Sequence, residues 1–112
     1  MEVNNRMIGS VAILEISGDV DLYSASELKE NISQILYMKK MILDLKKVNY
    51  IDSSGLGVLC STHTELKKSG GALKLVGVTD TVMNLFKMTR LIRFFEIFKD
   101  EKTAHASYYP NQ

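Results

Sequence analysis

The chain is organised around one stretch, Ile51-Asp52-Ser53-Ser54-Gly55-Leu56-Gly57. A strongly apolar run, residues 41–45, precedes this stretch, and apolar residues at helical spacing follow it. The pattern predicts a buried strand that leads, through a short turn, into the N-terminus of a helix. A small hydroxyl residue at such a junction is well presented to other molecules, and a helix N-terminus tolerates a phosphate.

Length and composition indicate one ordinary globular domain. The 112 residues are too few for two conventional domains, and their 14 basic and 13 acidic side chains are intermixed. This balance gives no basic patch for nucleic acid, and no apolar run approaches the ~20 residues of a membrane-spanning helix. The first residues lack the basic-then-apolar order of a secretory signal, and the single Cys60 gives neither a disulfide nor a metal cluster. We therefore expect a cytoplasmic protein with no cofactor and no metal.

The first half of the chain predicts a hairpin, a helix and a central strand. Residues 2–8 and 11–16 read as two strands joined by the turn Gly9-Ser10, which favours antiparallel pairing. A helix should follow, with Ser24 as N-cap and Glu27 at the spacing of a capping box. The run 41–45 is apolar on both faces except at Asp44, as in a strand covered on both sides. Because a helix precedes this run, it should pair in parallel with the earlier strand through a right-handed crossover.

The second half predicts three further helices and two further strands. A helix from about Ser54 to Lys68 should turn Leu56, Leu59, Cys60 and His63 inward, and place Val58 on its outward face. The remaining elements are a strand at 72–76, a helix capped by Thr79 or Asp80, a short strand within 94–98, and a helix from Asp100 to Ala106, with residues 107–112 as a tail. The expected fold is α/β, with a mixed, mainly parallel sheet of about four to five strands and about four helices.

Several kinds of site compete for the Asp52-Ser53-Ser54-Gly55 turn. The simplest is a helix start, in which Asp or Ser caps free N–H groups and glycine permits a tight turn. A nucleophile elbow needs glycine two residues before the serine, and Ile51 or Asp52 stands there instead. A phosphate-binding loop needs Gly-Lys-Ser/Thr, which the chain lacks. A serine presented to a modifying enzyme also fits, because the helix dipole would tolerate its phosphate.

The chain resembles the STAS-domain family (sulphate transporter and anti-sigma antagonist), in particular the stand-alone bacterial anti-sigma factor antagonists. The resemblance covers nearly the whole chain, about residues 11–104. It is carried by Gly18-Asp19-Val20-Asp21, Leu43-Asp44-Leu45, Tyr50-Ile51-Asp52-Ser53-Ser54-Gly55-Leu56-Gly57, Gly70-Gly71-Ala72-Leu73 and Leu85-Phe86-Lys87-Met88-Thr89-Arg90-Leu91.

The resemblance implies a phosphorylation cycle centred on Ser53, the first hydroxyl residue after the aspartate. The unphosphorylated antagonist would bind an anti-sigma factor that is also a serine kinase, and so free a sigma factor. The kinase would then phosphorylate Ser53, and a serine phosphatase would reset it. ATP and magnesium would belong to the kinase, so the chain itself would be no enzyme.

The partner-binding surface that the resemblance implies surrounds this serine. It comprises Asp19, Asp21, Asp52, Ser54, Gly55, Leu56, Gly57 and Val58. Asp19 and Asp21 fit equally well as residues that cap a loop turn. Val58 would be an apolar anchor on a polar helix face, although single exposed valines are common. Two other functions stay open: a STAS subunit of a stress-signalling scaffold or of a lipid-transport complex, and a small nucleotide-hydrolysing enzyme.

Overall fold

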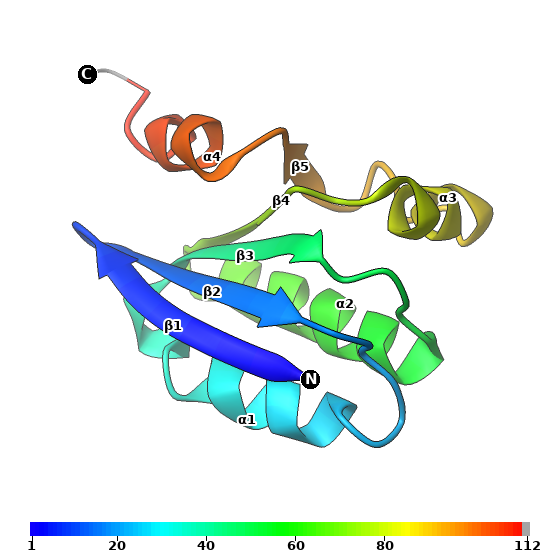
Figure 1. Ribbon diagram of the computed structural model, residues 1–112. Coiled ribbons are helices and arrows are strands. Elements are labelled where there is room, and N and C mark those ends of the chain that lie inside the picture. The colour runs from blue at the N-terminus through cyan, green and yellow to red at the C-terminus, as the bar shows by residue number, and fades with distance from the viewer. Residues whose placement is uncertain (111–112) are drawn as a thin grey trace.

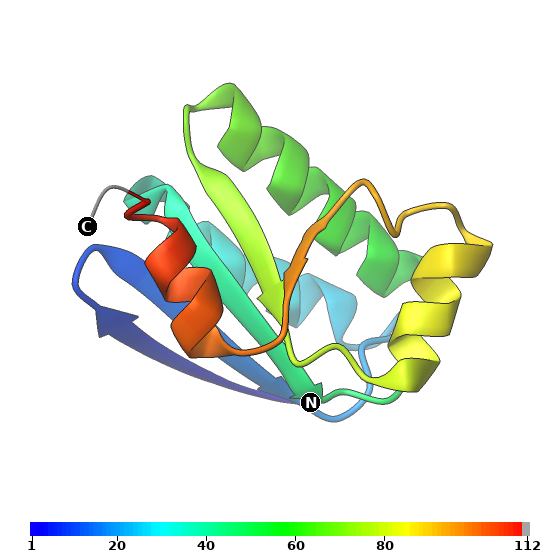
Figure 2. The same ribbon diagram turned by 90° about the horizontal axis from the view of Figure 1, so that it is seen from above.

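A computed structural model of the protein describes residues 1–110 and shows a five-stranded sheet with helices on both faces. The strands lie in chain order across the sheet, and only the first pair is antiparallel (Figures 1 and 2). The elements are β1 (Glu2–Ile8), β2 (Val11–Ser17), α1 (Ala25–Ser33), a 3-10 turn (Leu36–Met38), β3 (Lys40–Lys47), α2 (Ser53–Lys68), β4 (Ala72–Val76), α3 (Asp80–Met88), β5 (Glu96–Phe98) and α4 (Glu101–Ser107). This arrangement confirms the predicted fold class.

The two faces of the sheet carry cores of unequal size. Helices α1 and α2 cover one face, α4 covers the other, and α3 lies beyond the carboxyl end of β4 (Figure 1). The larger core lies under α1 and α2 and includes Leu14, Leu43 and Leu59; the smaller lies under α4 and includes Ile13 and Ile42. Strand β3 is therefore apolar on both faces because both are covered, as its sequence predicted.

The opening hairpin and the central crossover confirm the predicted pairings. Ile8 pairs with Val11 across the Gly9-Ser10 turn, and Gly9 has the positive φ of +61° that such a turn requires. Strand β2 runs parallel to β3, with Leu14 beside Leu43, and α1 forms the connection between them. The carboxyl ends of β2 and β3 thus lie side by side, and this brings the loops that follow them together.

The start of α1 differs from the predicted capping box. Ser24 is the N-cap, but its side chain makes no cap hydrogen bond to the helix. Its hydroxyl instead donates to the carbonyl oxygen of Asp19 at 3.1 Å and accepts from the backbone N–H of Asp21 at 3.0 Å. The carboxylate of Asp21 accepts from the N–H groups of Tyr23 and Ser24. An aspartate turn, completed by Ser24, therefore replaces the capping box.

Ser107 and Tyr108, which the sequence placed in a tail, belong to the folded domain. Helix α4 begins after Asp100, whose carboxylate accepts from the N–H of Thr103 at 2.8 Å, as expected. The expected tail over 107–112 is wrong at its start, because Tyr108 packs against the sheet and bonds to the backbone of Met41 and Ala72. Residues 111 and 112 lie outside the described part.

Candidate functional site

The site is built where the loops after β2 and β3 are joined by backbone hydrogen bonds. Val20 and Ile51 form an isolated parallel bridge between the two loops. The Val20 N–H donates to the Tyr50 carbonyl at 2.9 Å, and the Asp52 N–H donates to the Val20 carbonyl at 3.0 Å. The loop that contains Asp19 and Asp21 is therefore fixed directly beside the turn that contains Ser53.

Asp52 is the residue that connects this turn to both of its neighbours. One carboxylate oxygen, Oδ1, accepts from the N–H groups of Ser54 at 2.8 Å and Gly55 at 3.1 Å, and so caps α2. The other oxygen, Oδ2, accepts from the N–H of Leu22 at 2.9 Å, in the adjoining loop. The negative charge also lies at the positive end of the helix dipole, which stabilises it there.

The two serines after Asp52 occupy different environments. Ser53 is the first residue of α2 and is exposed, whereas Ser54 is half-buried. A modifying enzyme would therefore reach the Ser53 hydroxyl more readily than that of Ser54. The sequence alone did not distinguish the two serines; it was the family resemblance that selected Ser53.

The two glycines of the turn differ in what surrounds them. A Cβ atom at Gly55 would lie 2.7 Å from Ile51 Cγ2 and 2.8 Å from Val20 Cγ1, distances that real Cβ atoms do not adopt. Glycine at this position lets the first turn of α2 lie directly on the two joined loops. A Cβ atom at Gly57 would meet nothing within 4 Å, and this residue is exposed. Gly57 therefore leaves open space on the surface of α2, one helical turn from Ser53.

The expected outward position of Val58 is wrong. Its side chain is only 8% exposed and belongs to the larger core, as does that of Leu56 at 9%. Thr62, one helical turn beyond Val58, is also buried, and its hydroxyl donates to the Val58 carbonyl at 2.7 Å. Helix α2 packs against α1 as well as against the sheet, and this second contact buries the face that the sequence assigned to solvent.

The loop after β2 presents apolar side chains that sequence reasoning missed. Leu22 is 69% exposed and Tyr23 is 90% exposed. Asp19 is also exposed, whereas Asp21 is half-buried, and its carboxylate is occupied by the turn hydrogen bonds described above. The sequence contains one signal for this surface: Leu22 and Tyr23 are large apolar residues that stand between the turn-forming residues Asp21 and Ser24. Asp21 therefore holds the loop in shape, while Asp19, Leu22 and Tyr23 are free to meet another molecule.

A shallow apolar groove of about 390 Å³ lies between the 49–51 segment and α3. Its lining includes Tyr50, Leu85 and Met88, and the Met88 side chain is 81% exposed. The groove lies beside the joined loops, because Tyr50 lines the groove and its carbonyl also accepts the Val20 N–H. Helical spacing could not reveal it, since the groove depends on how α3 lies against the end of the sheet.

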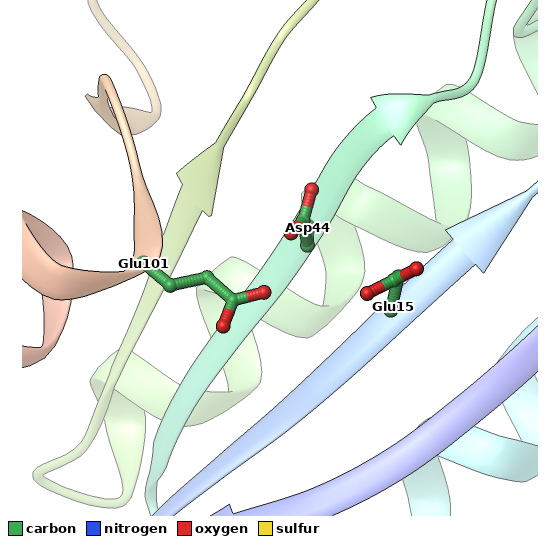
Figure 3. Close-up of side chains that lie close together, drawn as sticks. All are labelled: Glu15, Asp44 and Glu101. Carbon is green, nitrogen blue, oxygen red and sulfur yellow. The ribbon is translucent and has the colours of Figure 1, made fainter.

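A second polar cluster lies on the other face of the sheet, under α4. The carboxylates of Glu15, Asp44 and Glu101 come from β2, β3 and α4 and point toward one another (Figure 3), with oxygens within 4.8 Å. Carboxylate oxygens are ligands for magnesium and calcium. Within residues 1–110, this cluster is therefore the candidate binding site for such an ion. No sequence motif links these three residues, which lie far apart in the chain.

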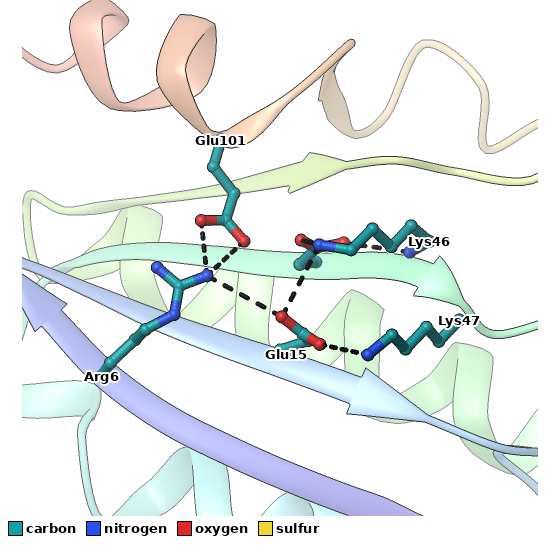
Figure 4. Close-up of polar contacts among 6 residues, drawn as sticks. Arg6, Glu15, Lys46, Lys47 and Glu101 are labelled. Carbon is teal, nitrogen blue, oxygen red and sulfur yellow. Dashed lines mark hydrogen bonds and ion pairs between the residues drawn. The ribbon is translucent and has the colours of Figure 1, made fainter.

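Cations already neutralise these three carboxylates. Each acid has a basic partner, and the resulting network joins the two outer elements to the central strand (Figure 4). The pairs are Arg6–Glu101 at 2.6 Å, Lys46–Asp44 at 2.8 Å and Lys47–Glu15 at 3.0 Å. A metal ion would have to displace these cations, so we assign the cluster to the attachment of α4.

The titration of the Asp44–Glu101 pair follows from this crowding. Burial acts to raise the pKa of Asp44, but hydrogen bonds from Glu101 and Lys46 outweigh it and lower that pKa. Hydrogen bonding to Asp44, together with burial, raises the pKa of Glu101. Within this pair the Asp44 carboxyl therefore loses its proton at a lower pH than the Glu101 carboxyl, and Lys46 pairs with the Asp44 carboxylate at 2.8 Å.

The turn at Ser53 and the mixed sheet that presents it belong to a known class of domain. The STAS domain family model matches residues 2–104, so the chain belongs to the STAS domain family. This confirms the family that the sequence resemblance indicated.

Relatives within this family agree in their assignment. The chain is 36% identical over 85 residues to the anti-sigma-B factor antagonist of Bacillus subtilis, covering 75% of this chain and 78% of that protein. It is 31% identical over 99 residues to the anti-sigma-B factor antagonist of Listeria monocytogenes, covering 87% and 86%. A crystal structure of a Thermotoga maritima protein assigned as an anti-sigma factor antagonist superposes with a TM-score of 0.89 at 25% identity, covering 94% and 92%. Within residues 1–110, no helix has the length and apolar character needed to cross a membrane.

Proposed function

We propose that this protein is an anti-sigma factor antagonist whose binding to its partner is switched off by phosphorylation of Ser53. The observation that carries the proposal is the exposure of Ser53 on the first turn of α2, beside a loop with exposed apolar residues. The relatives named as anti-sigma-B factor antagonists support the assignment of the partner class.

The proposed switch adds charge without disturbing the core. The γ-phosphoryl group of ATP passes to Ser53 Oγ, the hydroxyl proton leaves, and ADP remains with the kinase; a phosphatase later hydrolyses the ester and releases inorganic phosphate. The phosphoryl group brings about −1.5 to −2 charges at neutral pH. The dipole of the 16-residue helix α2 favours an anion at this end, so the fold should persist while the surface around Ser53 becomes more negative.

The proposed docking surface is smaller than the sequence indicated. It comprises the exposed residues Asp19, Leu22, Tyr23, Ser53 and Gly57. The other predicted binding residues hold this surface in place. The carboxylates of Asp21 and Asp52 accept backbone hydrogen bonds, the one of Asp52 from the N–H of Ser54. Gly55, Leu56 and Val58 are buried beneath the surface. The partners are an anti-sigma factor serine kinase and a serine phosphatase, and we place the protein in the cytoplasm with them.

The proposal assigns binding rather than catalysis to the chain. Of the two histidines, His63 is 5% exposed and packs against Phe94 and Phe95, and His105 lies on α4, on the far face of the sheet. Neither histidine can act as a base for the Ser53 hydroxyl. In this proposal the kinase supplies the base, the nucleotide and the metal.

The test compares the two serines with a kinase identified from the protein's own cell by co-purification. With kinase and ATP, we expect mass spectrometry to place one phosphate on the wild-type chain and on Ser54→Ala, and none on Ser53→Ala. Ser53→Ala should keep its affinity for the kinase, and Ser53→Asp should weaken it. A phosphate on Ser53→Ala, or a co-purified transporter or scaffold in place of a kinase, would show that the proposed function is wrong.

A further inference from the structure

The carboxylate of Asp52 is shared between two structural elements. Its Oδ1 binds the N–H groups of Ser54 and Gly55 in α2, and its Oδ2 binds the N–H of Leu22, two residues beyond the end of the joined segment at Val20. The backbone bonds of Val20 hold the loop to the 50–52 segment independently of any side chain. Beyond Val20, the Leu22 contact is the bond that joins the exposed tip of the loop to the turn of Ser53.

The tip that this bond holds carries two large, highly exposed side chains, Leu22 and Tyr23. Leu22 and Tyr23 are 69% and 90% exposed, and the turn hydrogen bonds of Asp21 fix the tip internally but not against α2. A change at Asp52 Oδ2 would therefore move or loosen Leu22 and Tyr23 together, while Val20 stays in place.

A phosphoryl group on Ser53 would act on Asp52 before any other residue. Ser53 follows Asp52 directly, so a second anion would lie beside the carboxylate and compete for the N–H groups at the N-terminus of α2. The phosphate carries more negative charge than the carboxylate and offers three acceptor oxygens to these N–H groups. Repulsion between the two anions then displaces the carboxylate toward solvent, and its most exposed bond, to Leu22, breaks first.

We propose that Asp52 is a positioning residue that couples the phosphorylation state of Ser53 to the Leu22–Tyr23 loop tip. Phosphorylation releases the Leu22 N–H from Asp52 Oδ2, and the loop tip that carries Leu22 and Tyr23 becomes more mobile. The proposal rests on the proposed function for the identity of the modification. It adds that the switch acts through the neighbouring loop as well as through charge at Ser53.

The test uses the full-length chain with phosphoserine incorporated genetically at position 53, so no kinase is needed. Amide hydrogen exchange measured by NMR should be about five- to tenfold faster at Leu22 than in the unmodified protein, as expected for the loss of one hydrogen bond. The Val20 amide, bonded to the Tyr50 carbonyl at 2.9 Å, should be unchanged. Phosphoserine at Ser61, an exposed position farther along α2, is the matched control for charge and should leave Leu22 unaffected.

A variant of Asp52 tests the coupling itself. Asp52→Asn keeps one side-chain oxygen for the cap of α2 and replaces the other by an NH₂ group, which cannot accept from Leu22. Its Leu22 amide should already exchange fast, and phosphoserine at 53 should add nothing further. Two results would overturn the proposal. One is a Leu22 amide whose exchange rate is unchanged by phosphoserine at position 53 in the wild-type background. The other is phosphoserine at position 53 that accelerates Leu22 exchange as much in Asp52→Asn as in the wild type. If Asp52→Asn does not fold, the comparison of positions 53 and 61 in the wild-type background still decides. Failure of a kinase to modify Ser53 would count against the proposed function alone.

Discussion

Gly55 lies so close to Val20 that a Cβ atom at this glycine would be 2.9 Å from the Val20 carbonyl oxygen. The same carbonyl accepts the N–H of Asp52, so it cannot move away without breaking the bond that joins the two loops. Gly57, two residues further along α2, has no such neighbour. Gly55 is therefore required by the fold, and Gly57 is available for the function.

Alanine substitutions should separate these two roles. We expect Gly55→Ala to lower the free energy of unfolding by about 1–3 kcal/mol through overpacking. Gly57→Ala should raise it by about 0.5–1 kcal/mol, because alanine is the better helix former at an exposed position. Urea denaturation of both variants checks this. Gly57→Ala should also weaken binding to the kinase partner if the surface beside Ser53 docks it; equal destabilisation by both substitutions would contradict the assignment.

The sequence predicted the fold well because its elements are long, periodic and bounded by clear signals. The alternation and turn of the hairpin, the two-sided apolar run of β3 and the Gly70-Gly71 stop after α2 each specify structure locally. The short strand β5 and helix α4 were also predicted, since Asp100 is an ordinary N-cap. What was missed at the chain end is the packing of Tyr108, which no local pattern encodes.

The site was predicted less completely because it depends on contacts between elements. The position of Ser53 follows from the strand-to-helix pattern, but the bond between Asp52 and Leu22 joins residues 30 positions apart. The burial of Val58 depends on the packing of α1 against α2. The apolar stripe of a helix indicates the face that packs against the sheet, and it does not indicate that a second helix covers another face. The groove beside Tyr50 likewise requires the placement of α3.

Val58 provides a direct test of its revised position. Because its side chain is 8% exposed within the larger core, Val58→Ala should lower the free energy of unfolding by about 1.5–2.5 kcal/mol. An exposed anchor would instead leave stability within about 0.5 kcal/mol and weaken only partner binding. Chemical denaturation, followed by a binding measurement on the folded variant, distinguishes the two positions.

The hydroxyl of Tyr108 should stabilise the attachment of α4 to the sheet. It accepts from the Met41 N–H at 3.1 Å and lies 2.6 Å from the carbonyl oxygens of both Met41 and Ala72, and burial raises its pKa. Tyr108→Phe leaves these groups without their partner and should cost about 1–3 kcal/mol of unfolding free energy.

Tyr109 is the matched control for Tyr108. Its hydroxyl contacts the exposed Ser10 side chain, so Tyr109→Phe should change the unfolding free energy by no more than about 0.5 kcal/mol. Thermal or urea unfolding of the two variants gives the comparison. A Tyr108→Phe protein as stable as Tyr109→Phe would mean that water replaces the lost hydroxyl under α4.

His63 should make the stability of the protein fall in mild acid. Its ring packs against Phe94 at a centroid distance of 4.6 Å, and its buried Nδ1 has no hydrogen-bond partner within residues 1–110. Burial, with a smaller effect of Lys67, lowers the pKa of His63, although Glu96 acts in the opposite direction. The folded protein thus binds this proton less readily than the unfolded chain, whose histidine has a pKa of about 6.5.

The sign of the effect follows directly from this difference. The contribution of His63 to stability is fully present above pH ~6.5 and is lost as the pH falls below that value, by at most about 1.4 kcal/mol per pH unit. Urea unfolding at pH 7.5 and 5.5 should therefore show a larger loss for the wild type than for His63→Leu, which keeps an apolar side chain at this position. All other titrating groups are common to both proteins, so the difference isolates His63. Equal losses would mean that the aromatic pair Phe94 and Phe95 accommodates an imidazolium, as cation–π attraction to their rings would allow.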